Sequence, residues 1–361
     1  MGKNGSDALK DIIPPMRRAV ARALEGRPLM GIEVPEAAGG RISSWLHRAP
    51  QNRAEAPDRT ASQDQAAQQG SAGAAGGRTA AVFELHGGGF ALGDVRKGDA
   101  LRTWIAHRYG VNVVGVGYRL APEHPWPAAL DDVIDTLEYF AGHADEYGMD
   151  PDAFYLVGYS AGANLALATC LKLQERDDLA FRIRGMALHY PFLDAAVDPA
   201  SLGTGGEDIP AEMMEAFNRW YAVDNDPRNP LISPLFASDG QLAALPRVVQ
   251  YPVARDALRP SVEALHARLA AAGCDCSLQV VEGAYHGYIE DAENLAVYRA
   301  TSLPETVAAR PSGFAQVAAE SMAESLDALL GRPVSDVPFR PDRADEDARA
   351  FAADAAGEVR R

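Results

Sequence analysis

The sequence has few cysteines, few positive charges and no long uncharged hydrophobic run. Three cysteines among 361 residues cannot build a disulfide framework, which favours a reducing compartment. Lys and Arg total 34 against 50 Asp and Glu, and the net charge of −16 argues against a nucleic-acid partner. A membrane span needs about 18 apolar residues, and Ile12-Ile13 runs directly into Pro14-Pro15 where an export signal would need its apolar core. We therefore expect a cytoplasmic protein without a membrane span.

Residues 51–79 contain no Val, Ile, Leu, Met or aromatic residue, and 8 of them are Ala, 5 Gln and 4 Gly. Such a segment cannot bury enough apolar surface to offset its ordering, so we predict a flexible linker. Residues 332–361 are rich in Asp, Arg and Ala and predict a disordered tail. Met16–Leu29 carries apolar residues at helical spacing, so we predict a small helical piece within residues 1–50. The main domain is predicted at 80–331.

In this main domain, short apolar runs rich in β-branched residues alternate with longer amphipathic stretches. The runs predict the strands Ala81–Leu85, Val111–Tyr118, Phe154–Gly158, Ile183–His189, Val248–Tyr251 and Ser277–Val281. The stretches predict the helices Ala100–His107, Ala128–Ala141, Ala161–Gln174, Ser261–Ala272 and Phe314–Leu330. This alternation predicts an α/β fold with a mostly parallel central sheet and helices on both faces.

The strongest local motif is Gly158-Tyr159-Ser160-Ala161-Gly162, which lies between a predicted strand and a predicted helix. A strand-to-helix turn this sharp crowds the backbone, and glycines two positions either side of the serine relieve the crowding. The Ser160 hydroxyl would then stand at the carboxyl edge of the sheet beside a helix N-terminus, where free amides suit a developing oxyanion. A structural turn rich in Gly and Ser is the alternative.

A second motif, His86–Phe90, holds three consecutive glycines directly after a predicted strand. Glycines let the backbone adopt positive φ and bring amide groups close to a ligand. In an acyl-transfer site the amides of Gly88 and Gly89 would complete an oxyanion hole with that of Ala161. A glycine hinge or a phosphate loop is the alternative, although the Lys and Ser or Thr that a P-loop requires are missing.

Together these motifs resemble those of the hormone-sensitive-lipase-like family of α/β-hydrolase serine esterases. The resemblance covers residues 80–331 and includes Tyr118–Ala128, Asp256–Arg259 and His286–Tyr288. It implies an α/β-hydrolase fold with a helical cap over the serine. One departure is Tyr159, which precedes the nucleophile where the family often has Asp or Thr.

A serine nucleophile needs a neighbouring imidazole as its base, and that imidazole needs a carboxylate to orient it. In α/β-hydrolases the base follows the serine and the acid along the chain. Of the histidines after Ser160, His189 closes a predicted strand and His266 sits inside a predicted helix. His286 lies in a loop just after the last predicted strand, at the expected edge of the sheet. We therefore predict His286 as the base.

Asp256 is the predicted acid, because it follows a predicted strand by a few residues and would reach the imidazole from the adjacent loop. The resemblance also points to Asp256, although Ala257 stands where the family usually has proline. Asp194 and Glu282 are the runners-up, and a charge near a helix start is the structural alternative for Asp256.

The resemblance also implies a lid, made by residues 1–50 as an N-terminal helical cap segment and by an insertion predicted at about 200–225. Within this insertion Ile209–Tyr221 is rich in Met and aromatic side chains, which can line an acyl or alcohol pocket. The predicted substrate-binding residues are Phe90, Tyr159, Met213 and Phe217. Plain packing on the core is the alternative for each of them.

These residues predict a serine carboxylesterase that hydrolyses small to medium acyl esters through an acyl-enzyme, with a deacetylase as one form. A non-hydrolytic member of the fold (a lyase, an acyltransferase or a ligand receptor) is the alternative. The expected partner is a small-molecule ester, and the oligomeric state, with a homodimer among the alternatives, stays open. No cofactor is expected, and no metal site, because Cys274 and Cys276 have no second Cys pair.

Overall fold

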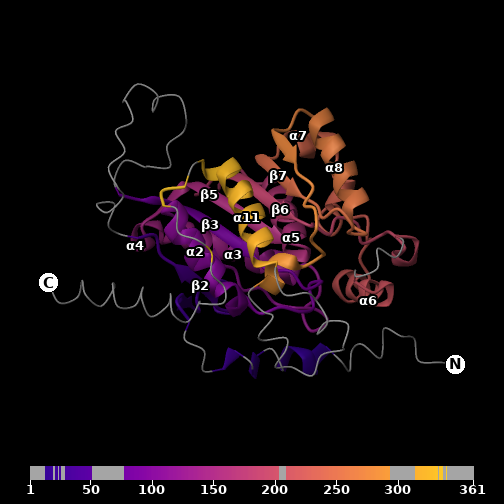
Figure 1. Cartoon of the computed structure of the whole chain (residues 1–361), viewed down its shortest axis with the longest axis horizontal. Coiled ribbons are helices and arrows are strands. Elements are labelled where there is room, and N and C mark those ends of the chain that lie inside the picture. Colours follow the sequence, from indigo (N-terminus) through magenta and orange to yellow (C-terminus); the bar gives the residue numbers. More distant parts are fainter. Residues whose placement is uncertain are drawn as a thin grey trace.

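The computed structural model describes residues 13–18, 21–22, 24–25, 29–50, 77–202, 209–292, 314–331, 333–335 and 339. Residues 51–76 of the predicted linker and most of the predicted tail at 332–361 lie outside these ranges, as do residues 203–208 of the predicted insertion. The described strands form one sheet of eight, in the order β1-β2-β4-β3-β5-β6-β7-β8 (Figure 1).

The sheet confirms the predicted α/β-hydrolase architecture. Its strands are β1 (Ile32–Val34), β2 (Ser44–His47), β3 (Thr79–Leu85), β4 (Asn112–Gly115), β5 (Met149–Tyr159), β6 (Ile183–His189), β7 (Arg247–Tyr251) and β8 (Cys276–Leu278). All neighbouring pairs from β4 to β8 are parallel, whereas β2 runs antiparallel to both β1 and β4. The carboxyl ends of the parallel strands therefore share one edge of the sheet, where side chains from distant parts of the sequence can meet.

The helices connect these strands and cover both faces of the sheet. They are η2 (Val95–Gly98), α2 (Asp99–Tyr109), α3 (Ala128–Gly142), α4 (Ala144–Tyr147), α5 (Ala161–Leu173), η3 (Pro199–Ser201), α6 (Ala211–Ala222), η4 (Pro234–Phe236), α7 (Asp239–Ala243), α8 (Arg259–Ala271) and α11 (Ala315–Leu330). Figure 1 shows α11, drawn in yellow, lying across the sheet.

Alternate residues of the central strand β3 point to opposite faces, as strand geometry requires. Val82 packs into a cluster with α2 and α11, and Phe83 packs into a cluster with α3, α5 and α8. Both side chains are fully buried. Burial on both faces explains why the parallel strands are nearly continuous apolar runs in the sequence.

Two strands lie in the segment predicted as a helical cap. Residues 13–18 are helical, but β1 and β2 join the antiparallel edge of the sheet, so Ile32–Val34 and Ser44–His47 extend the sheet and do not cover it. These strands are only three and four residues long, too short to show a clear alternation of apolar and polar residues.

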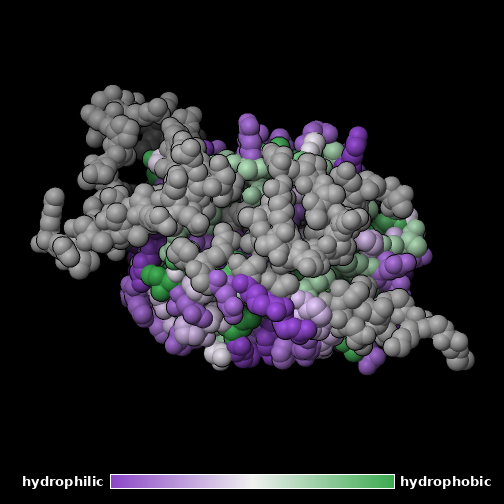
Figure 2. Space-filling view, turned by 60° about the horizontal axis from the view of Figure 1, so that its bottom comes forward, coloured by the Kyte–Doolittle hydropathy of each residue, from purple (hydrophilic) through white to green (hydrophobic). Residues whose placement is uncertain are grey.

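Figure 2 shows one face of the molecule with mostly hydrophilic side chains along its lower margin and small hydrophobic spots between them. Among the described residues, the large apolar side chains that are exposed are Ile32, Val223, Phe236 and Val334. None of the described helices combines the length and the hydrophobicity needed to cross a bilayer.

Candidate active site

Ser160 lies at the sharp turn from β5 into α5. Its φ of 51° and ψ of −114° hold a non-glycine residue in a strained left-handed conformation. A Cβ atom at Gly158 would lie 2.5 Å from the carbonyl oxygen of Gly162, and one at Gly162 would overlap the carbonyl oxygen of Leu85. The backbones of β3, β5 and α5 therefore meet at this turn, and only glycine fits on either side of the serine.

Three predicted side chains meet at the carboxyl edge of the sheet. The His286 Nε2 atom lies 2.8 Å from the Ser160 Oγ atom, and the His286 Nδ1 atom lies 2.7 Å from Asp256 Oδ2. All three residues are buried. The Asp256 Oδ1 atom accepts the backbone N–H of Leu258 at 2.9 Å, which fixes the carboxylate. When Nδ1–H donates its hydrogen bond to the carboxylate, Nε2 carries no proton and can accept the one on the serine hydroxyl.

The end of β6 supports this arrangement from the neighbouring strand. The Ser160 N–H donates to the carbonyl oxygen of His189 at 3.0 Å, and the Phe192 N–H donates to the carbonyl oxygen of Ser160 at 3.2 Å. The Tyr190 ring stands edge-on to the His286 ring, with 5.0 Å between their centroids. Backbone hydrogen bonds thus hold the serine, and an aromatic contact holds the imidazole.

The other two histidines that follow Ser160 in the sequence, His189 and His266, have hydrogen-bond partners away from the Ser160 hydroxyl. The His189 Nε2 atom lies 3.1 Å from the Ser325 hydroxyl, and burial lowers the pKa of His189 to about 3, so its ring is neutral near pH 7. The His266 Nδ1 atom lies 3.0 Å from the side-chain oxygen of Gln250 on β7. Both rings therefore serve packing and hydrogen bonding away from the nucleophile.

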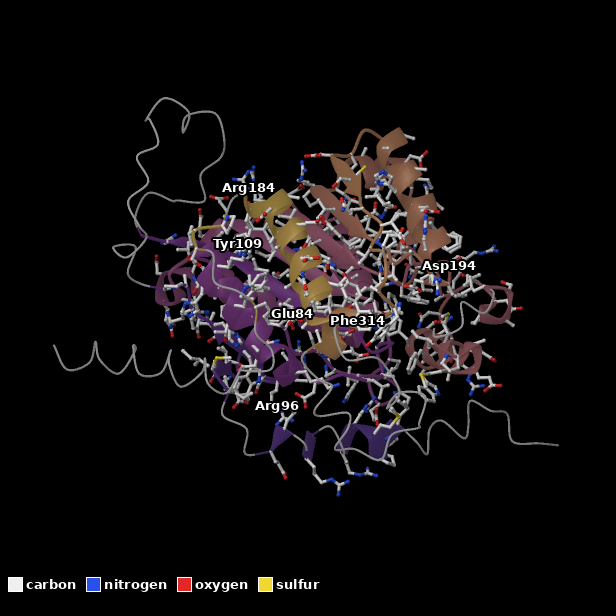
Figure 3. The ribbon with its side chains drawn as sticks, in the orientation of Figure 1. Glu84, Arg96, Tyr109, Arg184, Asp194 and Phe314 are labelled. Carbon is white, nitrogen blue, oxygen red and sulfur yellow. The ribbon has the colours of Figure 1, made fainter. Side chains whose placement is uncertain are left out.

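The two runner-up carboxylates lie outside the hydrogen-bonded chain. Asp194 accepts the backbone N–H groups of Ala196 at 2.8 Å and Val197 at 3.1 Å, so it organises its own turn. Figure 3 shows Asp194 on the side of the molecule that carries α6 and α8. Glu282 is exposed. Of the carboxylates weighed from the sequence, Asp256 is the one hydrogen-bonded to the imidazole.

The glycine-rich loop begins beside the nucleophile turn, because Leu85 of β3 pairs with Gly158 of β5. Gly88 has φ 112° and Gly89 has φ 59°, both in the region that favours glycine. The carbonyl oxygen of Gly88 accepts the N–H of Leu92 at 2.7 Å, which closes the turn. The N–H of Ala161, in the first turn of α5, has no acceptor within its helix. These amides are the predicted oxyanion donors.

The two predicted cap segments pack against this loop. Ile13, from the helix at 13–18, shares a small apolar cluster with Ala91 and with Phe217 and Trp220 of α6. In the same helix, the Arg17 Nε atom donates to the carbonyl oxygen of Ala91 at 2.7 Å. The segment following the three glycines is therefore covered from two sides.

The predicted substrate-binding residues fall into two groups. Phe90 stacks on Tyr221 of α6 with 3.7 Å between ring centroids, and the Phe217 ring lies so close to the Gly89 Cα that a Cβ atom there would overlap it. Met213 is half-buried and packs against the small apolar cluster that contains Phe217. Tyr159 instead packs in the core cluster that contains α2 and α11, on the opposite face of the sheet from the main cluster that includes Phe90.

Sequence reasoning missed two residues near the site. Tyr190 contacts the His286 ring, but a positive-φ residue after a strand gives no sequence signal. The Glu290 Oε1 atom accepts the N–H of Gly87 at 2.8 Å. His286 lies just before the helical turn at 288–292 that carries Glu290, and no local sequence pattern indicates the contact with Gly87.

Within the described ranges, no group of three His, Cys, Asp or Glu side chains is arranged to hold a metal ion. Cys276 is the first residue of β8 and Cys274 lies two residues before it. Burial raises the pKa of the Cys274 thiol to about 11. A raised pKa disfavours the thiolate form that ligates metals.

A sharp serine turn, a hydrogen-bonded Ser–His–Asp chain and an adjacent glycine loop on a mostly parallel sheet define an α/β hydrolase. Residues 82–290 match the profile of a family described as alpha/beta hydrolase fold, and the chain belongs to that family. This membership confirms the resemblance to the hormone-sensitive-lipase-like group.

The chain is similar to several esterases. It is 35% identical over 162 residues to an esterase of Acinetobacter venetianus, covering 44% of this chain and 52% of that protein. It is 28% identical over 212 residues to an acetyl esterase of Salmonella paratyphi B, covering 58% and 65%. The chain thus spans less than two thirds of the length of either relative. A solved hyperthermophilic esterase from the archaeon Pyrobaculum calidifontis superposes with a TM-score of 0.63 at 25% identity, covering 90% of this chain and 92% of that one.

Proposed function

We propose that this chain is a serine carboxylesterase that hydrolyses small to medium acyl esters through an acyl-enzyme. The observation that carries the proposal is the hydrogen-bonded chain from the Ser160 hydroxyl through His286 to Asp256. The esterase relatives support the same chemistry.

In the first half of the reaction, Ser160 Oγ attacks the acyl carbon and its proton passes to His286 Nε2. Asp256 keeps the imidazole in the productive tautomer and stabilises the imidazolium that forms. The carbonyl oxygen becomes an oxyanion, which the amides of Gly88, Gly89 and Ala161 stabilise. Loss of one such donor typically costs about 100–1000-fold in rate. His286 then returns the proton to the leaving alcohol, and the acyl-enzyme remains.

In the second half, water replaces the alcohol. His286 takes a proton from the water, whose oxygen attacks the acyl carbon, and a second oxyanion forms in the same amide site. Collapse of this intermediate releases the carboxylic acid, and the proton on His286 returns to the Ser160 oxygen. The two halves use the same side chains in the same positions.

A short acyl group is supported by the side chains around the glycine loop. Phe217 packs directly against Gly89, and Phe90 is stacked on Tyr221, so bulky rings border the loop that would hold the acyl oxygen. An acetyl group fits beside such rings more easily than a long chain does. The name of the Salmonella relative, an acetyl esterase, agrees with deacetylation as the form of the reaction.

The test is a series of p-nitrophenyl esters from acetate to dodecanoate, run with the wild type and with Ser160→Ala. We expect the highest kcat/KM with the shortest esters and a loss of about a million-fold in kcat in Ser160→Ala. Titration of the released acid distinguishes hydrolysis from acyl transfer or elimination. Turnover that survives in Ser160→Ala, or product formed without free acid, would contradict the proposal.

A further inference from the structure

Glu290 is a carboxylate beside the glycine loop that the reaction steps do not use. It lies in the helical turn at 288–292, which follows His286 directly. Its Oε1 atom accepts the N–H of Gly87 at 2.8 Å, and a Cβ atom built on Gly87 would lie 2.7 Å from its Oε2 atom. A side chain at position 87 would therefore displace the carboxyl, so glycine is needed at 87 for this contact.

The Gly87 amide is one of three fixed points along the loop. On its N-terminal side, the Tyr118 hydroxyl donates to the carbonyl oxygen of His86 at 2.6 Å. On its C-terminal side, the carbonyl oxygen of Gly88 accepts backbone N–H groups at 2.7 and 3.1 Å. The Gly87 N–H and the His86 carbonyl oxygen belong to one peptide group, so Glu290 and Tyr118 hold the same peptide from its two sides. The contact between Glu290 and Gly87 also joins the loop to the segment that carries His286, the proposed base.

We propose that Glu290 is a positioning residue, which holds the His86–Gly87 peptide at the start of the loop so that the Gly88 and Gly89 amides that follow face the oxyanion. This inference rests on the proposed esterase function. Because each peptide unit is planar, fixing the His86–Gly87 plane leaves only the two dihedral angles of Gly87 to set the direction of the Gly88 N–H. The Gly87 carbonyl oxygen lies 2.8 Å from His86 Nδ1, and this contact restricts those angles. Hydrogen-bond donors accelerate the reaction only if they already point at the oxyanion when it forms. A loop whose amides could turn away would therefore lower kcat more than it changes KM.

The surroundings of Glu290 make its charge sensitive to pH. Burial raises its pKa to about 7, although the hydrogen bond from Gly87 and the positive charge of Lys97 act in the opposite direction. The titratable groups that interact with it electrostatically are Lys97, Asp291, His286, Tyr118 and Tyr190. The carboxylate is the better acceptor for the Gly87 N–H, so the loop should be held most firmly above pH 7.

The experiment compares Glu290→Ala with Glu290→Gln, using p-nitrophenyl acetate and thermal unfolding. Glu290→Ala removes the acceptor, and we expect kcat to fall by about 10–100-fold, less than for loss of a whole oxyanion donor, with KM within about twofold. Glu290→Gln keeps an oxygen at the same position and should restore kcat to within about threefold of the wild type. If Glu290→Ala does not fold, Glu290→Asp keeps the charge, withdraws the carboxyl by one methylene and should also lower kcat.

Asp291→Asn is the matched control, because Asp291 is a buried carboxyl in the same turn whose Oδ2 atom accepts the Tyr285 hydroxyl at 2.8 Å. We expect it to lower Tm and leave kcat within about twofold. Equal kcat in Glu290→Ala and the wild type, or kcat losses that simply follow the Tm losses across all variants, would overturn the positioning role while the esterase function stands. Absence of Ser160-dependent turnover in the wild type would overturn both.

Discussion

The turn that carries Ser160 and the predicted cap segments that pack against the glycine loop are held by different kinds of contact. At the turn, Cβ atoms on Gly158 and Gly162 would meet backbone atoms of the same turn and of β3. Under the cap, a Cβ atom on Gly89 would meet the Phe217 ring, which is a side chain of α6. Backbone in the middle of a sheet cannot move away, whereas a side chain can rotate or be replaced.

Under the proposed function, this difference separates the chemistry from the specificity. The turn that carries Ser160 would have to be the same for every ester, because one geometry would serve attack, oxyanion binding and proton transfer. The cap contacts can vary with little effect on that geometry, so they can set which acyl group fits. Substitutions at the turn should therefore abolish function, and substitutions in the cap should redirect it.

The largest effect is expected for Gly162→Ala. The new methyl group overlaps the carbonyl oxygen of Leu85, and overpacking of this kind typically costs about 1–3 kcal/mol. We expect a lower free energy of unfolding in urea and a loss of more than about 100-fold in kcat, because the Ser160 hydroxyl is displaced. Gly142→Ala, at the end of α3 where a Cβ atom meets open space, should leave both quantities nearly unchanged. Wild-type activity in Gly162→Ala would show that the turn is not rigid.

The second-largest effect is expected for Phe217→Ala, which should change the acyl-chain length that the protein prefers. Removal of the ring beside Gly89 opens space for a longer acyl chain, and one methylene is worth about 10-fold or more in discrimination. We expect the ratio of kcat/KM for the butyrate ester to that for the acetate ester to rise about tenfold. Phe236→Ala, which removes an exposed ring, should leave this ratio unchanged. An unchanged ratio in Phe217→Ala would place the acyl pocket elsewhere.

The two regions also differ in how far they could be predicted from the sequence. The parallel strands and the serine turn were predictable because their signals are local: continuous apolar runs, and glycines at fixed distances from Ser160. The predicted Ser160, Asp256 and His286 meet in space because each follows a parallel strand, and the carboxyl ends of those strands share one edge.

Contacts between distant side chains were not predictable in the same way. The pairing of β2 with β4 depends on a four-residue strand with no clear alternation. The contacts of Phe217 with Gly89 and of Glu290 with Gly87 depend on how loops pack, which no local pattern encodes. Tyr159 directly precedes Ser160 in the sequence, and because side chains alternate along a strand its ring packs in the cluster that contains α2 and α11.

A smaller effect is expected from Arg17→Ala. Arg17 bonds the carbonyl oxygen of Ala91 and pairs with Glu123 at 2.7 Å, so it fastens the helix at 13–18 to the active-site loops. Partial loosening of the cap should lower kcat/KM by about two- to fivefold and increase amide hydrogen exchange in that helix. Arg18→Ala, which removes an exposed arginine of the same helix, is the control and should change neither. Equal exchange in both variants would show that Arg17 does not fasten the cap.

The smallest effect is a pH dependence of stability that arises at Glu290. Its pKa is about 7 in the folded protein against an ordinary 4.5, so the fold binds this proton more tightly than the unfolded chain does. Protonation of Glu290 therefore adds to the free energy of unfolding below pH 4.5, and this contribution is lost as the pH rises through 7. Glu290→Gln has no carboxyl to ionise at this position, so it does not lose this stability. The Tm of Glu290→Gln minus the Tm of the wild type should therefore rise between pH 4.5 and 7 and stay constant above pH 7. A constant Tm difference would contradict the raised pKa.

The most direct test of the central claim is covalent labelling of the intact protein with diethyl p-nitrophenyl phosphate. A serine activated by His286 attacks phosphorus and expels p-nitrophenolate, which leaves a stable diethylphosphoryl ester. Mass spectrometry should find one adduct per chain on the peptide containing Ser160, none in Ser160→Ala, and much slower labelling in His286→Ala. A folded wild type that stays unlabelled, or an adduct that persists in Ser160→Ala, would contradict the account.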